Sequence, residues 1–477
     1  MPMPILEGRK FDREADRPSE VCMSLRQDFP RFSFDAYRYK IQKSDLIVQY
    51  DFSIGESIQF HPKVILRNVG EQIDNIKSGL LDNLVFHVGL AEVPSYWKAT
   101  CSPLVEINCG YLDSTQKAWW KHLFLHGMGE FFYTNKIDFA DDTFLEISST
   151  DRPTTPARPL DKPLAPRSLV PVGGGRDSAL TLDTLSKGNR PFRSMVLNPT
   201  PAAFRISARV QDDPPIIVER TIDPLLLEMN KRGFLNGHTP FSAYLAFLNA
   251  LCLVVYDYSE IVIANERSAN EPNTVFNGRE VNHQYSKSFA FEEHFDSYMS
   301  RYLVKTGKYF SLIRSLYEIQ IARGFARLPN MFRDFRSCNK LQRDDRWCGA
   351  CAKCVSVYIT SYPFMKEADL LGIFGSDLYE KSSTLELLRA LAGKGPYRPL
   401  DCICTADETL ASVSLAIARL EDARKPLPLA LRELKSDIHS EEARIRALAT
   451  QLLGSKGPDR LPPYFADLLK STMEQTA

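Results

Sequence analysis

Three consecutive glycines stand where a predicted strand meets a predicted helix, and their setting fits the binding of an anion. The apolar run 169–172 precedes them, and apolar residues at helical spacing follow over 177–185. Glycines let the backbone approach a phosphate without a Cβ in the way, and free N–H groups at a helix start point at its charge. The sequence therefore predicts a phosphate site made by Gly173, Gly174, Gly175, Arg176, Asp177 and Ser178.

This glycine turn differs from the two commonest phosphate-binding motifs. A Walker A loop requires Gly-Lys followed by Ser or Thr, and the turn has no such step. The dinucleotide motif requires Gly-x-Gly-x-x-Gly with an acidic residue further on, and the turn lacks that spacing as well. A plain strand-to-helix turn without a ligand therefore stays open as the alternative at this point.

Four of the ten cysteines are clustered at a spacing typical of a metal site, namely Cys338, Cys348, Cys351 and Cys354. Four thiolates fill the tetrahedral coordination sphere of zinc and leave no open position, so we predict structural Zn²⁺. An iron–sulfur cluster, a redox or persulfide role and free thiols are the alternatives. Of the others, Cys402 and Cys404 are too close to each other for an easy disulfide.

Dense polar segments form the third group of candidates. The segments 265–273 and 281–288 follow a predicted strand at 260–264, and they contain too few apolar residues to form a core. A binding site is therefore favoured over a solvated loop. A further segment at 236–240 contains His238, which could cap the helix expected at 240–256 or act as an acid or base.

The second half of the chain must supply the sheet that positions these groups. Apolar runs near 168–172, 194–197, 216–219 and 260–264 alternate with helical segments. Such alternation predicts an α/β fold, a parallel sheet with helices on both faces, whose ligands bind at the carboxyl ends of the strands. We expect this catalytic domain, with its four-cysteine site, over residues 167–365.

Different patterns flank that domain. We expect residues 1–20 to be disordered and 21–150 to form an α+β domain, with antiparallel strands over 32–69 and mostly helices after them. Residues 151–166 are rich in proline and are expected to be a linker. Residues 366–477 are expected to be helical, and we find no catalytic signal in them.

Net charge and hydropathy limit the classes of partner that we expect for this protein. Lys and Arg total 59, as do Asp and Glu, so the net charge is 0 and no global field favours nucleic acid or a membrane surface. No apolar run of about 18 residues is present, and the first residues do not resemble a secretory signal. We therefore expect a cytoplasmic protein whose anionic ligand is held by a local site.

The glycine turn resembles the PP-loop of the ATP pyrophosphatase superfamily, which is usually written Ser-Gly-Gly-x-Asp-Ser. Gly173 stands where that superfamily has serine, and Arg176, in the variable place, could supply charge in compensation. A PP-loop followed by four cysteines also resembles 7-cyano-7-deazaguanine synthase. In that superfamily the loop grips the pyrophosphate of ATP while an acceptor attacks the α-phosphate. The positions that match are Gly174, Gly175, Asp177 and Ser178.

A more specific resemblance comes from the surrounding segments, which are similar to the UDP-N-acetylmuramoyl-L-alanyl-L-glutamate epimerase family. In that family the turn also reads Gly-Gly-Gly-basic-Asp-Ser, so Gly173 and Arg176 follow the pattern. We estimate that the resemblance covers residues 30 to 370 and that the helical tail adds nothing to it. The segments that carry it are 86–90, 96–98, 236–240, 265–271, 281–288 and 347–354.

This resemblance implies a reaction in which a peptide's terminal carboxylate is adenylated by ATP with Mg²⁺. The α-carbon is then inverted by deprotonation and reprotonation, and hydrolysis releases AMP. The substrate would be a nucleotide-sugar peptide or a related peptide. Adenylation followed by nitrogen capture, giving an amide or nitrile, is one alternative, and tRNA thiolation is another.

The resemblance also implies roles for individual residues. The residues of the turn would hold the triphosphate, with Asp177 reaching Mg²⁺, and Asn198, after the second strand, would meet the adenosine. A general base must lie within hydrogen-bond reach of its proton, and a sequence does not show that distance. The candidates for carboxylate binding or proton transfer are Glu266, His283, Lys287 and His238.

Overall fold

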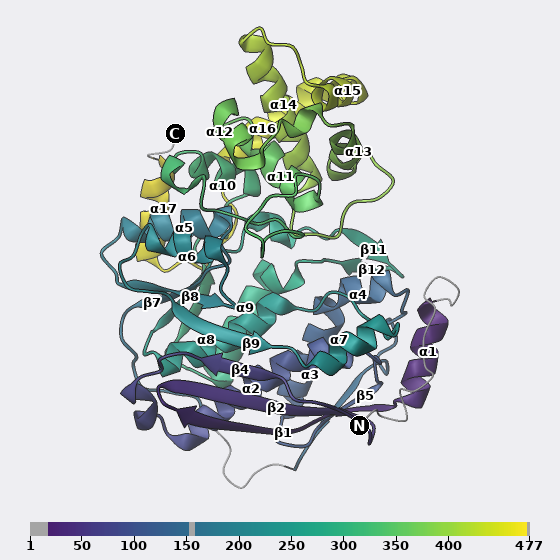
Figure 1. Cartoon of the computed structure of the whole chain (residues 1–477), viewed down its shortest axis with the longest axis vertical. Coiled ribbons are helices and arrows are strands. Elements are labelled where there is room, and N and C mark those ends of the chain that lie inside the picture. The colour runs from purple at the N-terminus through teal and green to yellow at the C-terminus, as the bar shows by residue number, and fades with distance from the viewer. Residues whose placement is uncertain (1–17, 152–157, 475–477) are drawn as a thin grey trace.

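The computed structural model describes residues 18–151 and 158–474 (Figure 1). The expected disorder at the N-terminus and most of the proline-rich linker therefore lie outside the described residues. Residues 18–20, which we also expected to be disordered, open helix α1 (Pro18–Asp28).

One sheet of eleven strands runs through the molecule in the order β13-β10-β7-β8-β9-β4-β2-β1-β5-β6, with β3 paired to β2. Neighbouring strands from β13 to β9 are parallel. The expected parallel strands and their alternation with helices are therefore confirmed. These strands are β7 (Ser168–Pro171), β8 (Phe192–Leu197), β9 (Ile216–Thr221), β10 (Glu260–Ile263) and β13 (Lys308–Ser311).

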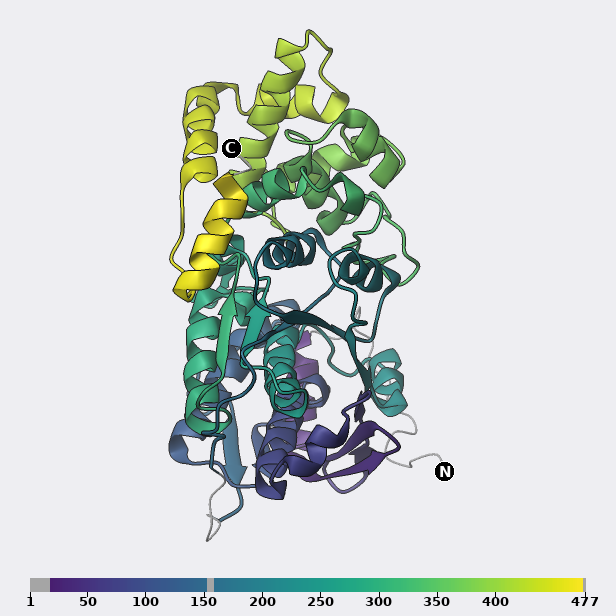
Figure 2. The same ribbon diagram turned by 90° about the vertical axis from the view of Figure 1, so that its left-hand side faces the viewer.

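Alternating side chains in the parallel strands enter two different cores. Leu169 and Met195 pack into one hydrophobic cluster, whereas their neighbours Val170 and Val196 pack into another. Successive side chains of a strand point to opposite faces, so both faces of this sheet are buried. Helix α8 (Phe241–Val255) covers the first face, and α5 (Arg176–Ser186) and α6 (Pro201–Ala208) cover the second (Figure 2).

The N-terminal strands extend this same sheet. Strand β4 pairs antiparallel with β9, from Lys63 opposite Thr221 to Leu66 opposite Val218. Hydrogen bonding is therefore continuous across the boundary that we expected between two domains, and the division into domains stays a prediction. The expected antiparallel pattern is confirmed by β1 (Arg31–Gln42), β2 (Asp45–Ile54), β3 (Ile58–Phe60) and β4 (Lys63–Leu66). Two further strands, β5 (Leu104–Ile107) and β6 (Glu146–Ser149), lie in a region that we expected to be mostly helical.

The remaining helices before the tail surround the sheet and carry several candidate residues. They include α2 (Ser78–Trp97), α3 (Ser114–Gly127), α4 (Gly129–Thr134), α7 (Pro224–Lys231), α9 (Phe289–Tyr302), α10 (Glu318–Phe325) and α11 (Ala352–Ser361). A small hairpin, β11 (Thr274–Phe276) and β12 (Arg279–Val281), stands apart from the main sheet.

The C-terminal region is helical, as predicted, and forms the upper part of the molecule (Figure 1). Its last helix returns to the sheet, where Phe465 and Leu469 share a core cluster with Val262. No helix within 18–151 or 158–474 is long and apolar enough to cross a membrane. The C-terminal helices are α12 (Glu367–Phe374), α13 (Ser382–Leu391), α14 (Ala406–Asp422), α15 (Leu429–Asp437), α16 (Glu442–Gly454) and α17 (Pro463–Glu474).

Candidate functional site

The glycine turn connects β7 to α5 and leaves its backbone N–H groups available to a ligand. Gly174 has φ 87°, and a Cβ there would lie 2.9 Å from the backbone nitrogen of Ala203, so only glycine fits. Gly175 caps α5 without any side-chain hydrogen bond. In the part of the chain that the structure describes, the N–H groups of residues 174–178 donate to no other group. Five free donors at a helix start fit an anion.

A cavity of about 310 Å³ opens beside this turn. Val172, Leu197 and Asn265, which end or follow three parallel strands, line it, so the cavity lies at the carboxyl edge of the sheet. Helix α8 contributes a mostly apolar wall that includes Phe241, and its polar side chains there include Asn249. The side chain of Asn249 is 1% exposed, and its Oδ1 has no hydrogen-bond partner. An unpaired acceptor at such a wall is suited to a donor on a ligand.

Charged side chains of both signs meet beneath the turn. Asp177, Lys287 and Lys353 line the cavity. Burial, together with the negative charges of Glu318 and Glu266, raises the pKa of Asp177 to about 7. Lys353 lies 3.3 Å from Glu318 in a buried ion pair, and this carboxylate helps to hold the pKa of Lys353 above its ordinary value despite burial. The cavity therefore combines fixed positive charge with a carboxyl that titrates near neutrality.

Arg176 faces the protein interior. Its side chain is 2% exposed and forms an ion pair with Glu318. The same guanidinium donates to the hydroxyl groups of Thr360 and Ser361, each at 2.9 Å. The positive charge that we expected to compensate for the missing serine thus contacts α10 and α11. These contacts hold the start of α5 against the protein interior.

Asn198 lies at the end of β8, as expected, but its side chain bonds to the neighbouring strand. Its amide donates to the carbonyl of Arg220 at 2.9 Å and accepts from the N–H of Arg220 at 2.8 Å. Its φ of 47° turns the chain out of the strand. Leu197, one residue earlier, lines the cavity.

Glu266 and Lys287 are held together by a buried arginine that the sequence did not reveal. Arg314 is fully buried and donates to the carbonyl oxygens of Glu266 and Lys287, each at 2.7 Å. Its charge is balanced by Glu292, 2.9 Å away and 1% exposed. Glu266 is also 1% exposed, and its Oε2 has no hydrogen-bond partner. Arg314 therefore fixes the two polar segments at the edge of the sheet.

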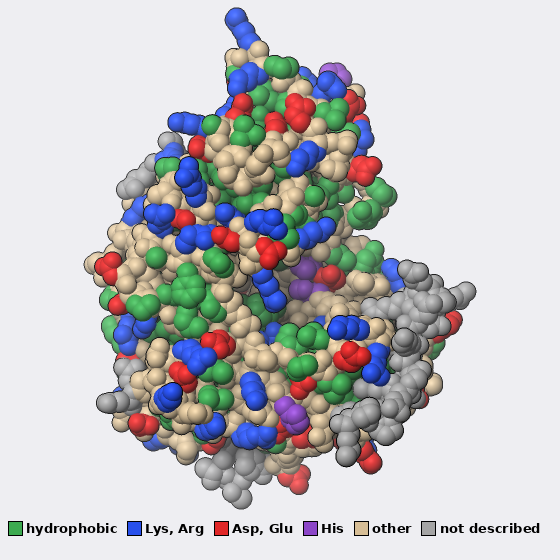
Figure 3. Space-filling model, in the orientation of Figure 1, with side chains coloured by type: hydrophobic (Ala, Val, Ile, Leu, Met, Phe, Trp, Pro, Cys, Tyr) green, Lys and Arg blue, Asp and Glu red, His purple; other side chains and the backbone are tan. Residues whose placement is uncertain are grey.

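The two candidate histidines lie side by side, with ring centroids 4.2 Å apart. The Nδ1 atom of His283 is hydrogen-bonded to Glu130, which also lies 3.8 Å from Nδ1 of His238. Burial and the neighbouring His283 lower the pKa of His238 to about 3, so it is neutral at pH 7. Burial opposes protonation of His283 too, but Cys402 and Glu130 beside the ring raise its pKa to about 10. Figure 3 shows histidine side chains inside a hollow on this face.

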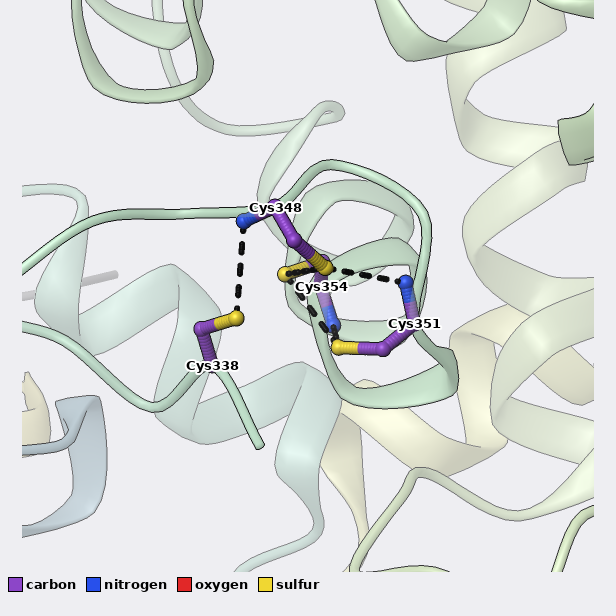
Figure 4. A group of neighbouring side chains, drawn as sticks. All are labelled: Cys338, Cys348, Cys351 and Cys354. Carbon is purple, nitrogen blue, oxygen red and sulfur yellow. Dashed lines mark hydrogen bonds between the residues drawn. The ribbon is translucent and has the colours of Figure 1, made fainter. Parts of the chain in front are cut away.

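The four clustered cysteines converge at one point (Figure 4). The sulfur of Cys354 lies 3.7 Å from that of Cys348 and 3.4 Å from that of Cys351. Four sulfurs about 2.3 Å from a central zinc would be about 3.8 Å apart, so the spacing fits a tetrahedral site. Backbone N–H groups of Leu341, Cys348, Cys351 and Cys354 donate to these sulfurs at 3.3–3.4 Å, which supports thiolates.

This cysteine loop forms one wall of the cavity. The N–H of Arg336 donates to the carbonyl of Gly174 at 2.8 Å, and the amide of Gln342 donates to the carbonyl of Gly173 at 3.1 Å. Arg336, Asn339 and Gln342 all line the cavity. A metal at the four cysteines would therefore stabilise the segment that touches the glycine turn.

Comparison with known families places most of the chain in one family. Residues 23–312 match the family model of the MurL N-terminal domain, and residues 334–446 match that of the MurL C-terminal domain. The chain belongs to the MurL family. The resemblance that we estimated at residues 30 to 370 was too short, because the second MurL domain extends through most of the helical region.

Curated relatives of this MurL chain are named UDP-N-acetyl-alpha-D-muramoyl-L-alanyl-L-glutamate epimerase. The one from a Micromonospora species is 29% identical over 92% of this chain and 97% of its own length. Those from Salinispora tropica and Xanthomonas oryzae pv. oryzae are each 28% identical, over 93% and 77% of this chain and 96% and 81% of their own lengths. No solved structure matches the chain at a comparable level of significance.

The C-terminal MurL domain supplies a cavity residue that sequence reasoning missed. Cys402 lies between α13 and α14 and lines the same cavity as the glycine turn. Burial opposes ionisation of its thiol, but the positive charges of Lys287 and His283 lower its pKa below the ordinary value. Its flanking sequence has no metal or catalytic spacing, and only the fold brings it to the site.

Proposed function

We propose that this chain epimerises the terminal glutamate of UDP-N-acetylmuramoyl-L-alanyl-L-glutamate, or of a related peptide, after adenylating its carboxylate with ATP. The observation that carries the proposal is the cavity at the glycine turn, which joins free backbone donors for phosphate to a wall of titratable side chains. Membership of the MurL family, whose curated relatives bear this epimerase name, supports the substrate class.

The residues around the turn fit a nucleoside triphosphate. The free N–H groups at the start of α5 are suited to phosphate oxygens, and the cradle at Gly174 admits no side chain. Lys353, which lines the same cavity, adds a fixed positive charge. The apolar face of α8, with the unpaired Oδ1 of Asn249, suits a base with an exocyclic amine.

Asp177 is the residue that would hold Mg²⁺ beside the phosphates. Magnesium in nucleotide sites is usually bound by one or two carboxylates together with phosphate oxygens. The Asp177 carboxyl lines the cavity directly after the turn, and a nearby cation would favour its ionised form over the neutral form that burial stabilises. ATP supplies the adenylyl group that activates the substrate carboxylate.

Activation is needed because the α-proton next to an ionised carboxylate is hard to remove. Loss of that proton would put a second negative charge on a group that already carries one. Adenylation neutralises the carboxylate, so a base of moderate strength suffices, and return of a proton to the opposite face inverts the centre. Inversion has almost no driving force of its own, so ATP lowers the barrier rather than shifting the equilibrium.

A second group of side chains, at the cavity and beside it, is suited to the substrate. Lys287, whose pKa is raised despite burial by the negative charges of Cys402 and Glu266, would neutralise the developing enolate. His283 and His238, with pKa values of about 10 and about 3, provide one charged and one neutral imidazole at pH 7. Glu266 would complete the binding of the peptide's charged groups. Zinc at the four cysteines would have a structural role, and the demand for ATP favours a cytoplasmic location.

The test is incubation of the protein with ATP, Mg²⁺ and UDP-N-acetylmuramoyl-L-Ala-L-Glu in heavy water. We expect AMP, pyrophosphate and one deuterium at the α-carbon of the terminal residue, all dependent on ATP. AMP release that rises on addition of ammonia, with a change in product mass, would instead indicate amide or nitrile formation. Deuterium that never enters the substrate while AMP accumulates would refute epimerisation.

A further inference from the structure

Cys402 stands at the end of a chain of three side chains that reaches into the cavity. The thiol lies close enough to the imidazole of His283 for each group to shift the pKa of the other, and Nδ1 of that ring is hydrogen-bonded to Glu130. A thiol, an imidazole and an orienting carboxylate in series are the arrangement by which proteins activate a cysteine. These groups come from α4, the second polar segment and the C-terminal region.

The backbone fixes the position of Cys402. The amide of Asn339 donates to both carboxylate oxygens of Asp401 at 2.7 Å, and the N–H of Cys402 donates to the same carboxylate at 2.7 Å. Asn339 itself lines the cavity. The segment of the C-terminal region that carries the thiol is thereby fastened to the loop that borders the glycine turn.

Burial opposes ionisation of the thiol, but positive charges around it lower its pKa below the ordinary value. Lys287, His283 and Lys353 act on it with positive charge, and Glu130 balances His283 from behind. A thiolate stabilised in this way is a moderate base, as the removal of a proton from an activated α-carbon requires. Lys287 lines the same cavity and is the ammonium suited to the enolate oxygen.

We propose that Cys402 is a catalytic residue that exchanges the α-proton on one face of the adenylated glutamyl group; this inference rests on the proposed function. The thiolate takes the proton, and the electron pair of the broken C–H bond passes to the acyl oxygen as an enolate. A proton that originates from water returns to the opposite face of the α-carbon. The thiol then loses the substrate-derived proton to solvent, which restores the thiolate. In heavy water the proton returned to the opposite face is a deuteron, so the product carries deuterium.

The geometry favours proton transfer over attack of the sulfur on the acyl carbon. A thioester would pass through an oxyanion, which is usually stabilised by backbone N–H groups including that of the nucleophile. The N–H of Cys402 is already engaged by Asp401 at 2.7 Å. Hydrolysis of the acyl-adenylate by water then gives AMP, and the substrate is never covalently linked to the enzyme.

The experiment compares Cys402→Ala with Cys404→Ala, two residues further on, in the full chain with ATP, Mg²⁺ and the nucleotide-sugar dipeptide in heavy water. Cys404 is fully buried, is bonded to Ser356 and Thr409, and does not line the cavity, so it controls for changes in this segment. We expect Cys402→Ala to release AMP within about threefold of the unmodified rate. We expect its deuterium incorporation to fall at least about 100-fold, while Cys404→Ala retains both.

Three results would overturn the inference. One is deuterium incorporation by Cys402→Ala at the unmodified rate. Another is a parallel loss of AMP and deuterium in a variant whose melting temperature is unchanged. The third is a substrate adduct on the unmodified protein, seen by intact mass, that is missing from Cys402→Ala. If that variant does not fold, Cys402→Ser provides the same comparison, because a serine hydroxyl is too weakly acidic to replace the thiolate. Failure of the unmodified protein to release AMP or take up deuterium would instead refute the proposed function itself.

Discussion

The cavity has two walls that use the chain in opposite ways. The wall at the glycine turn presents free backbone N–H groups, and the side chain of Arg176 points away from the cavity to Glu318. The second wall, the side-chain wall, presents Lys287 and Cys402 from separate segments, and His283 lies beside Cys402 and is hydrogen-bonded to Glu130. A site made of backbone N–H groups depends on the conformation of the chain. A site made of side chains depends on the charge of each side chain and on the buried residues that fix its position.

This difference decides which substitutions matter. At the turn, a change is harmful where it alters backbone space, even if no functional group is lost. At the side-chain wall, a change is harmful where it leaves a buried charge unpaired, even if the residue lies outside the cavity. Four predictions test this contrast.

The largest effect is expected behind the side-chain wall. Arg314→Met leaves Glu292 buried without its partner and frees the carbonyls of Glu266 and Lys287, so we expect a loss of about 3–5 kcal/mol in unfolding free energy. Chemical denaturation measures it. The double variant Arg314→Met/Glu292→Leu removes both charges and should recover a large part of the loss. A cost below about 1 kcal/mol for the single variant would show that the pair does not hold this wall.

The next effect contrasts two adjacent glycines of the turn. Gly174→Ala puts a Cβ 2.9 Å from the nitrogen of Ala203 at a φ of 87°, so we expect AMP formation to fall about 100-fold, or about 2.7 kcal/mol. Gly173→Ala meets nothing within 4 Å and should lose no more than a few-fold. Equal losses in the two variants would mean that the turn does not act through its backbone conformation.

Removal of metal should affect the turn through the cysteine loop. We expect about one zinc per chain, and its loss from Cys351→Ser or on chelation. Because residues Arg336 and Gln342 bond to the turn, the metal-free protein should bind ATP at least about tenfold more weakly, and its melting temperature should fall. Calorimetric ATP titration and elemental analysis check this. Unchanged ATP affinity after complete zinc loss would show that the cysteine loop does not support the glycine turn.

The smallest effect is a pH dependence at the turn. Asp177 has a pKa of about 7 in the folded chain against an ordinary value of 3.8, so the folded state binds its proton more tightly. Its contribution to stability is therefore fully present below about pH 4 and is lost as the pH rises to 7. The stability of the unmodified protein relative to Asp177→Asn should fall by at least about 1 kcal/mol between pH 4 and pH 8. A difference that grows with pH would contradict the burial of this carboxyl.

The same contrast explains what the sequence revealed. The glycine turn and the cysteine loop are each built from neighbouring residues, so their spacing was visible, and the strands around them were predicted from hydrophobic periodicity. The wall of side chains was only partly visible, because 153 residues separate Glu130 from His283 and Cys402 comes from a region in which we saw no catalytic signal. The sequence pattern also does not show whether a side chain faces the cavity or the protein interior. Arg176 was expected at the phosphate site but is buried against Glu318.

The central claim, that the substrate carboxylate is adenylated before inversion, is tested most directly by following oxygen. The terminal α-carboxylate of the dipeptide substrate is labelled with heavy oxygen, and the AMP released with ATP and Mg²⁺ is analysed by mass. If this carboxylate attacks the α-phosphate and water then cleaves the acyl bond, each AMP carries one labelled oxygen. AMP that is free of label, released while the α-carbon is being inverted, would contradict the claim.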